Sequence, residues 1–72
     1  MIAGDLAYIP SHTYLYEIDD KEDICDCERL EKPTNALVVE ASLKNSKEYY
    51  KILYKGKEWY VNCQDVYEVN NE

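Results

Sequence analysis

The sequence contains few of the residues that build specialised sites or cross-links. Gly4 and Gly56 are the only glycines, which excludes a glycine-rich phosphate-binding loop. The three cysteines are odd in number and too few for a disulfide framework, which indicates a reducing compartment. No apolar run approaches membrane-spanning length, and the first residues lack the basic-then-apolar pattern of a signal peptide. We therefore expect a soluble protein that is cytoplasmic or associated with a particle.

Basic residues are also scarce. Fifteen Asp and Glu residues against eight Lys and Arg residues give a formal net charge of −7. This balance repels phosphate backbones and anionic membranes, so we predict binding to neither nucleic acid nor membranes. The acidity could instead attract a basic partner or imitate nucleic acid, and its plainest interpretation is solubility.

Tyrosine is abundant: the chain has eight tyrosines and one tryptophan, and no phenylalanine. Its 72 residues form one domain, residues 1–72, near the lower size limit for a self-sufficient core. A buried tyrosine ring leaves water while its hydroxyl still needs a partner or solvent. We therefore expect half-buried tyrosine rings at the surface.

The segment from Lys47 to Val69 carries the clearest structural signal. Two runs rich in β-branched and aromatic residues flank Lys55-Gly56, which predicts a hairpin. A three-residue loop without a bulge would place Glu58 opposite Ile52, so the pattern favours a two-residue loop. That loop fixes the pairs Tyr50 with Val61, Ile52 with Trp59 and Tyr54 with Lys57, and leaves Lys51, Leu53, Glu58 and Tyr60 on the other face.

Three further strands are predicted before this hairpin. Leu6–Ile9 lies between Gly4-Asp5 and Pro10, and proline cannot continue a ladder. Thr13–Ile18 alternates, with Tyr14, Tyr16 and Ile18 on one side. Thr34–Leu43 places Leu37, Val39, Ala41 and Leu43 on one face, and Asn45-Ser46 marks the turn that follows.

The remaining segments are more polar. The acidic segment 19–32 has no sustained period, so we expect an exposed loop with Ile24 and Leu30 tucked down; a helix capped by Asp19 or Asp20 is the alternative. After the hairpin, we predict a 3₁₀ turn at Asn62–Val66, a short strand at Tyr67–Val69 and a frayed tail at Asn70–Glu72.

The sequence YKILYKGKEWYVNCQDVYEV (residues 50–69) resembles the distal hairpin, 3₁₀ turn and closing strand of the SH3-like β-barrel superfamily. Gly4-Asp5 resembles the opening of such barrels, and segment 19–32 would occupy a large early loop. The resemblance implies an all-β fold, a small SH3-like barrel of five to six short strands with a late 3₁₀ turn. The stretches GDLAYIP, ALVVE and GKEWYV are also similar in style to small uncharacterised proteins of marine tailed phages, which implies a virion as one location and brings no function.

Many members of the SH3 family bind proline-rich peptides in an aromatic groove. Tyr14–Ile18 resembles the aromatic segment of that groove, and Tyr49-Tyr50 stands where paired tryptophans begin a strand. The 3₁₀ turn, however, has Asn62 and Asp65 where the groove has a proline and a tyrosine. The loss of these two stacking surfaces counts against polyproline binding, and ordinary barrel packing is the other explanation for the tyrosines.

Metal binding and catalysis have weak support. The candidate ligands are three thiols and an imidazole, from Cys25, Cys27, Cys63 and His12. The C-x-C spacing is less diagnostic than C-x-x-C, and the neighbouring acids disfavour thiolate formation. His12 has no evident nucleophile nearby in the sequence. We therefore predict no metal, no cofactor and no enzymatic activity.

Two functional hypotheses remain. The first is a non-enzymatic interaction or structural module, such as a phage accessory or particle-associated protein, that acts by homo-oligomerisation or by protein binding. Its candidate protein-binding surface is Tyr14, Tyr16, Tyr49 and Tyr60. The second is an acidic inhibitor, or a nucleic-acid mimic, that occupies a basic host factor.

Overall fold

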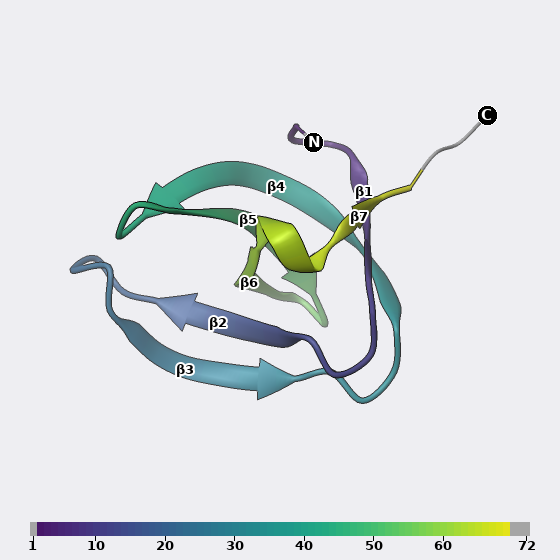
Figure 1. Cartoon of the computed structure of the whole chain (residues 1–72), viewed down its shortest axis with the longest axis horizontal. Helices are drawn as coiled ribbons and strands as arrows, with labels where there is room; N and C mark the ends of the chain where they lie inside the picture. Colours follow the sequence, from purple (N-terminus) through teal and green to yellow (C-terminus); the bar gives the residue numbers. More distant parts are fainter. Residues whose placement is uncertain (1, 70–72) are drawn as a thin grey trace.

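The computed structural model describes residues 2–69, which form one antiparallel sheet and a single 3₁₀ turn (Figure 1). The seven strands lie in the order β3-β2-β6-β5-β4-β1-β7, so β3 and β7 are the two open edges. The predicted all-β class is confirmed, but the described residues form seven strands and not the five to six expected, because residues 24–29 form a strand that was not predicted. The elements are β1 (Leu6–Ile9), β2 (Tyr14–Ile18), β3 (Ile24–Arg29), β4 (Thr34–Lys44), β5 (Lys47–Tyr54), β6 (Lys57–Asn62), η1 (Cys63–Asp65) and β7 (Tyr67–Glu68).

The predicted hairpin of β5 and β6 is confirmed with its register. Lys55 and Gly56 form the two-residue turn with φ of 52° and 75°, the left-handed geometry that suits a hairpin. Ile52 lies opposite Trp59, as expected. Trp59 is only 7% exposed and Ile52 is fully buried, whereas Glu58 is exposed.

Strand β4 was located correctly, and its turn at Asn45-Ser46 is present, but the prediction of its apolar face was wrong. Leu37 is 42% exposed and Val38 is fully buried. A register shift between Val38 and Glu40 inserts an extra residue into β4, and such a bulge reverses the alternation on either side of it. Leu37 and Ala41 consequently lie on different faces.

The acidic segment 19–32 was predicted to be a loop, and this was wrong. It contains β3, which pairs with β2 from Arg29 back to Ile24, with a register shift that leaves Cys25 without a partner in the ladder. Leu30 is buried as expected, but Ile24 is 54% exposed. Every residue of β3 is exposed, so β3 is a strand because of its backbone pairing and not because of apolar periodicity.

The other predicted elements are confirmed with small changes in their ends. β1, β2, η1 and β7 fall where the pattern placed them. The Asn62 side chain accepts a hydrogen bond of 2.9 Å from the Gln64 N–H, which caps the 3₁₀ turn. The predicted frayed tail at Asn70–Glu72 lies outside the described residues.

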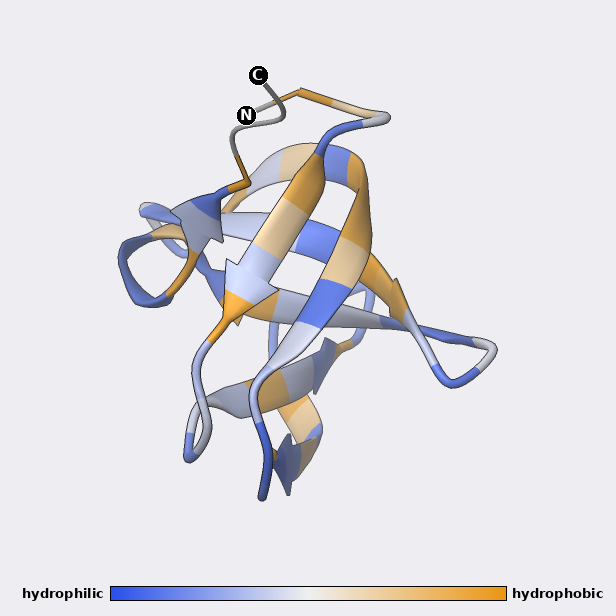
Figure 2. Ribbon diagram, turned by 90° about the vertical axis from the view of Figure 1, so that its right-hand side faces the viewer, coloured by the Kyte–Doolittle hydropathy of each residue, from blue (hydrophilic) through white to orange (hydrophobic). Residues whose placement is uncertain are grey.

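The core lies inside the curl of the sheet, where the long β4 arches over β5 and β6 and the β2–β3 hairpin closes the opposite side (Figure 1). Hydrophobic and hydrophilic residues alternate along the strands that enclose it (Figure 2). Among residues 2–69 no polar or charged residue is buried. The buried cluster comprises Ala7, Ile9, Leu15, Leu30, Ala36, Val38, Ile52, Trp59, Val61 and Val66, with Tyr50 and Tyr54 packed against it.

Candidate protein-binding surface

Three of the four tyrosines singled out from the sequence meet on the outer face of β2, β6 and β5. Tyr16 pairs directly with Tyr60 across β2 and β6. The Tyr49 ring centroid lies 6.2 Å from that of Tyr16 and 6.4 Å from that of Tyr60, with interplanar angles of 81° and 79°. These are edge-to-face contacts, the arrangement that the charge distribution of an aromatic ring favours.

The four residues differ in how far they reach solvent. Tyr14 lies two residues before Tyr16 on the same side of β2 and is 45% exposed. Tyr16 and Tyr60 are half-buried, and Tyr49 is buried at 7% exposure. Tyr49 therefore lies beneath Tyr16 and Tyr60, the two rings that it contacts. We call Tyr14, Tyr16, Tyr49 and Tyr60 the tyrosine surface.

Lysines border the tyrosine surface. The Nζ atoms of Lys51 and Lys44 lie 5.5 and 5.8 Å from the Tyr60 ring centroid, within the range of a cation–π contact. Lys51 also pairs with Glu40 at 3.7 Å and with Glu58 at 3.8 Å. Burial alone would lower the pKa of Lys51, but Tyr60, Glu58 and Glu40 outweigh it and raise that pKa.

Within the tyrosine surface, the environment of Tyr16 favours its protonated hydroxyl. Burial is the main cause that raises the pKa of Tyr16, and the nearby Tyr49 and Asp65 add to it. The surface presents aromatic rings with charged residues around them, an arrangement that is common in protein–protein interfaces.

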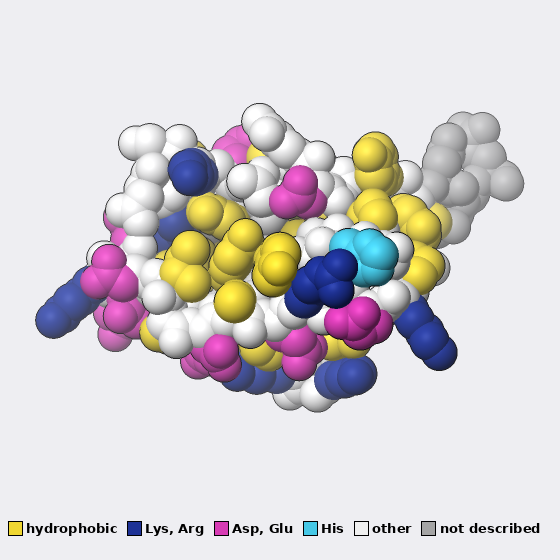
Figure 3. Space-filling model, turned by 60° about the horizontal axis from the view of Figure 1, so that its bottom comes forward, with side chains coloured by type: hydrophobic (Ala, Val, Ile, Leu, Met, Phe, Trp, Pro, Cys, Tyr) yellow, Lys and Arg dark blue, Asp and Glu magenta, His cyan; other side chains and the backbone are white. Residues whose placement is uncertain are grey.

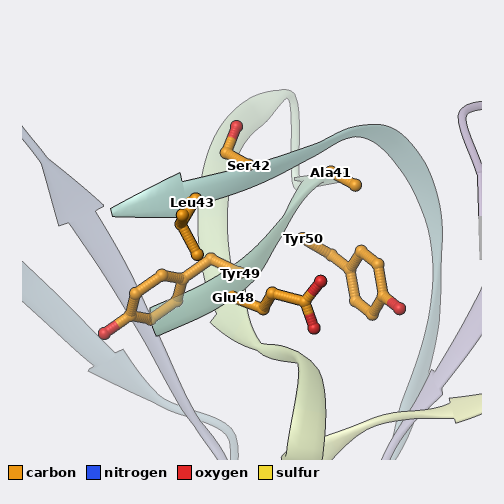
Figure 4. Close-up of a pocket in the computed structure, with 6 residues that line it drawn as sticks. All are labelled: Ala41, Ser42, Leu43, Glu48, Tyr49 and Tyr50. Carbon is orange, nitrogen blue, oxygen red and sulfur yellow. The ribbon is translucent and has the colours of Figure 1, made fainter. Parts of the chain in front are cut away.

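A shallow hollow of about 280 Å³ lies between the ends of β4 and β5 (Figure 4). Tyr49 and Tyr50 point to opposite sides of β5 (Figure 4), and Leu43 of β4 pairs with Glu48. Glu48 on this rim is 3.5 Å from the Cys63 Sγ atom, and burial together with this contact raises the pKa of Cys63. The hollow is smaller than the ligand pockets of about 300–1,000 Å³ that hold drug-sized molecules.

A row of three exposed leucines crosses another part of the sheet. Leu6 pairs with Leu37, and Leu37 pairs with Leu53, so the three side chains lie side by side across β1, β4 and β5. Each is between 40% and 45% exposed. The sequence did not indicate this leucine row, because the bulge in β4 decides that Leu37 faces outward.

The candidate metal ligands are dispersed over the fold. Cys25 and Cys27 are exposed on β3, Cys63 lies in η1, and His12 occupies the turn before β2 with φ of 70°. Within the described part of the chain, no three His, Cys, Asp or Glu side chains are grouped as a metal site requires. No helix formed by residues 2–69 is both long and apolar enough to span a membrane.

The chain matches none of the protein-family models, curated proteins or solved structures with which it was compared. Its function is therefore inferred from the geometry of its own surface. Sequence reasoning identified the tyrosines but missed the role of Lys51, which the hairpin register already placed opposite Tyr60.

Proposed function

We propose that this protein is a non-enzymatic interaction module that binds a protein partner, or a second copy of itself, through the tyrosine surface. The observation that carries the proposal is the convergence of Tyr16, Tyr49 and Tyr60 from three strands into one edge-to-face cluster. Tyrosine supplies a large contact area with little loss of side-chain entropy and is enriched at interface centres. Lys44 and Lys51 beside Tyr60 provide the polar border of such a site.

We also propose that the fold is an SH3-like barrel. The order of elements supports this: a first strand, an inserted β2–β3 hairpin, a three-stranded meander, a 3₁₀ turn and a short closing strand that returns to β1. As such a module, the protein would act as a phage accessory or particle-associated protein, and the resemblance to small phage proteins adds the virion to the cytoplasm as a proposed location.

Sedimentation velocity over a range of protein concentrations tests self-association through this surface. Tyr14→Ser and Tyr60→Ser remove one exposed and one half-buried ring and should shift the protein towards monomer. Leu37→Ser is the matched control, because it removes an apolar side chain of similar exposure from the leucine row. Loss of self-association in Leu37→Ser alone would assign the contact to the leucine row and contradict the proposal.

If the wild type is a monomer at all concentrations, the same variants test partner binding. A protein that co-purifies with the wild type should be lost from Tyr14→Ser and Tyr60→Ser and kept by Leu37→Ser. Circular dichroism spectra that match the wild type would show that the variants are folded. Equal retention by all three variants would refute a binding role for the tyrosines.

A second candidate function is that of an acidic inhibitor of a basic host factor. Seven of the fifteen acidic residues lie in β2, β3 and the turn between them, so the negative charge is concentrated on one hairpin. This inhibitor would displace a labelled DNA duplex from a basic DNA-binding domain in a salt-sensitive way. Failure to displace the duplex at low salt would exclude this candidate.

A further inference from the structure

The open edge of β3 has a defined set of outward backbone groups. The Leu30 N–H donates to the Thr13 carbonyl at 2.9 Å, and antiparallel ladders bond alternate residues. In the register of β2 and β3, the N–H and C=O groups of Glu28 and Asp26 therefore point towards β2. Those of Cys27 and Arg29 point outward. The Cys27 N–H agrees with this assignment, because it donates to the Asp26 carboxylate at 2.8 Å.

The two faces of this edge carry different chemistry. Cys27 pairs with Tyr16 and Arg29 pairs with Tyr14, so these side chains share the face of the tyrosine surface. Glu28 and Asp26 lie on the other face, opposite Leu15 and Glu17. In Figure 3, hydrophobic side chains gather in the middle of the surface brought forward, and acidic side chains lie along its border.

The acids on the second face are available to a partner. Glu17 is already paired with Lys57 at 2.9 Å. None of the ion pairs found among residues 2–69 involves Asp26 or Glu28. A second copy of β3 would bring the same acids to this edge, and like charges on adjacent strands are destabilising.

We propose that the edge of β3 accepts an extended segment of another protein in which basic and apolar residues alternate. The segment adds a strand next to β3 and bonds to the outward groups of Cys27 and Arg29, which is the general mode of strand addition. Its basic side chains meet Asp26 and Glu28. Its apolar side chains lie against Cys27, on the side of the sheet that carries Tyr14 and Tyr16. The inference rests on the proposed function only in taking the partner to be a protein.

Binding requires one local exchange. The Asp26 carboxylate releases the Cys27 N–H and pairs with a basic side chain of the segment, while a carbonyl of the segment accepts from that N–H. The hydrogen bonds between β2 and β3 stay in place, because the outward groups are not part of their ladder. The edge therefore gains a strand without any rearrangement of the core.

Synthetic hexapeptides test the inference with the full-length protein. The probe is an acetylated and amidated Lys-Val-Lys-Val-Lys-Val peptide, and its matched control has Glu in place of Lys. Titration into ¹⁵N-labelled protein should move the amide signals of Cys27 and Arg29 and slow their hydrogen exchange for the lysine probe. Equal binding of both peptides, or shifts confined to residues outside β3, would overturn the inference.

Backbone methylation of the probe separates strand addition from simple charge attraction. Only alternate N–H groups of an added strand face β3. One probe is therefore N-methylated at every valine and a second at every lysine, and only one of the two should lose binding. Loss with N-methylvaline corresponds to an antiparallel strand, and loss with N-methyllysine to a parallel one. Equal effects of the two modifications would contradict strand addition.

Charge reversal in the protein provides the reciprocal test. The double variant Asp26→Lys and Glu28→Lys leaves the backbone unchanged, and it should lose roughly tenfold or more in affinity for the lysine probe and gain affinity for the glutamate probe. Leu37→Ser should bind the lysine probe like the wild type, because Leu37 lies on β4 in the leucine row, away from β3 in the strand order. In one possible outcome, Tyr60→Ser abolishes binding of the protein partner, while the wild type does not bind the lysine probe. That outcome would refute the edge inference and leave the proposed function in place.

Discussion

Replacement of Trp59 by alanine tests the packing inside the curl of the sheet. Trp59 is 7% exposed, lies opposite Ile52 and has the Lys57 Nζ atom 4.3 Å from its ring centroid. Removing a buried tryptophan side chain costs about 3–5 kcal/mol. At about 0.05–0.15 kcal/mol per residue, a chain of 72 residues has a total free energy of unfolding of about 4–11 kcal/mol. Trp59→Ala should therefore remove about a quarter of the free energy of unfolding or more.

Urea denaturation followed by far-UV circular dichroism measures this loss, because Trp59 is the only tryptophan and its fluorescence disappears with the substitution. Glu58→Ala is the control: this neighbour is exposed and pairs with Lys51 at 3.8 Å at the surface, so it should cost less than about 1 kcal/mol. Trp59→Phe should fall between the two. A cost below about 1 kcal/mol for Trp59→Ala would refute the assignment of this ring to the core.

Three other predictions follow from the surface residues. Changing both Cys25 and Cys27, which are exposed on β3, to serine should leave the melting temperature within about 4 °C of the wild type, and a chelator should not change it; a larger loss would revive a metal site. Burial raises the pKa values of Cys63 and Tyr16 above their ordinary 9.0 and 10.0. The fold therefore favours their protonated forms, and stability measured by denaturation should be full below pH 9 and fall as the pH rises through the raised values; constant stability to pH 11 would contradict this. Fluorescence anisotropy should find no oligonucleotide complex tighter than about 10⁻⁴ M at physiological salt, because Lys51 is paired with acids; a micromolar complex abolished by Lys51→Glu would refute it.

The local parts of the fold could be predicted from sequence because their signals are local. Lys55-Gly56 and Asn45-Ser46 each adopt positive φ in a two-residue turn, and turn residues of this kind fix the register of the strands that they join. The 3₁₀ turn was recognisable because Asn62–Val66 is too polar for a core strand and too short for an α-helix.

The errors concern features that depend on distant parts of the chain. β3 has no buried residue, so periodicity could not reveal a strand that exists through its pairing with β2. The bulge after Val38 is set by how β4 pairs with β5. Because of it, Leu37 and Ala41 lie on opposite faces of the sheet and not on the same face as predicted.

The candidate site was predicted only in part for the same reason. Alternation placed Tyr14 and Tyr16 on one side of β2, but the pairing of Tyr16 with Tyr60 joins distant segments. Sequence reasoning treated all four tyrosines as surface residues, whereas Tyr49 is buried beneath its neighbours. Its burial depends on two rings contributed by other strands.

The order of the sheet also has a consequence for how the chain folds. β4, β5 and β6 form a continuous meander joined by two short turns, so their contacts can form while the rest of the chain is still unfolded. The pairings of β2 with β6 and of β1 with β7 join residues far apart in the sequence, and closing such large loops slows folding. We expect the meander to form early and the β2–β3 hairpin to dock late, so that half of the tyrosine surface is assembled only in the last stage of folding.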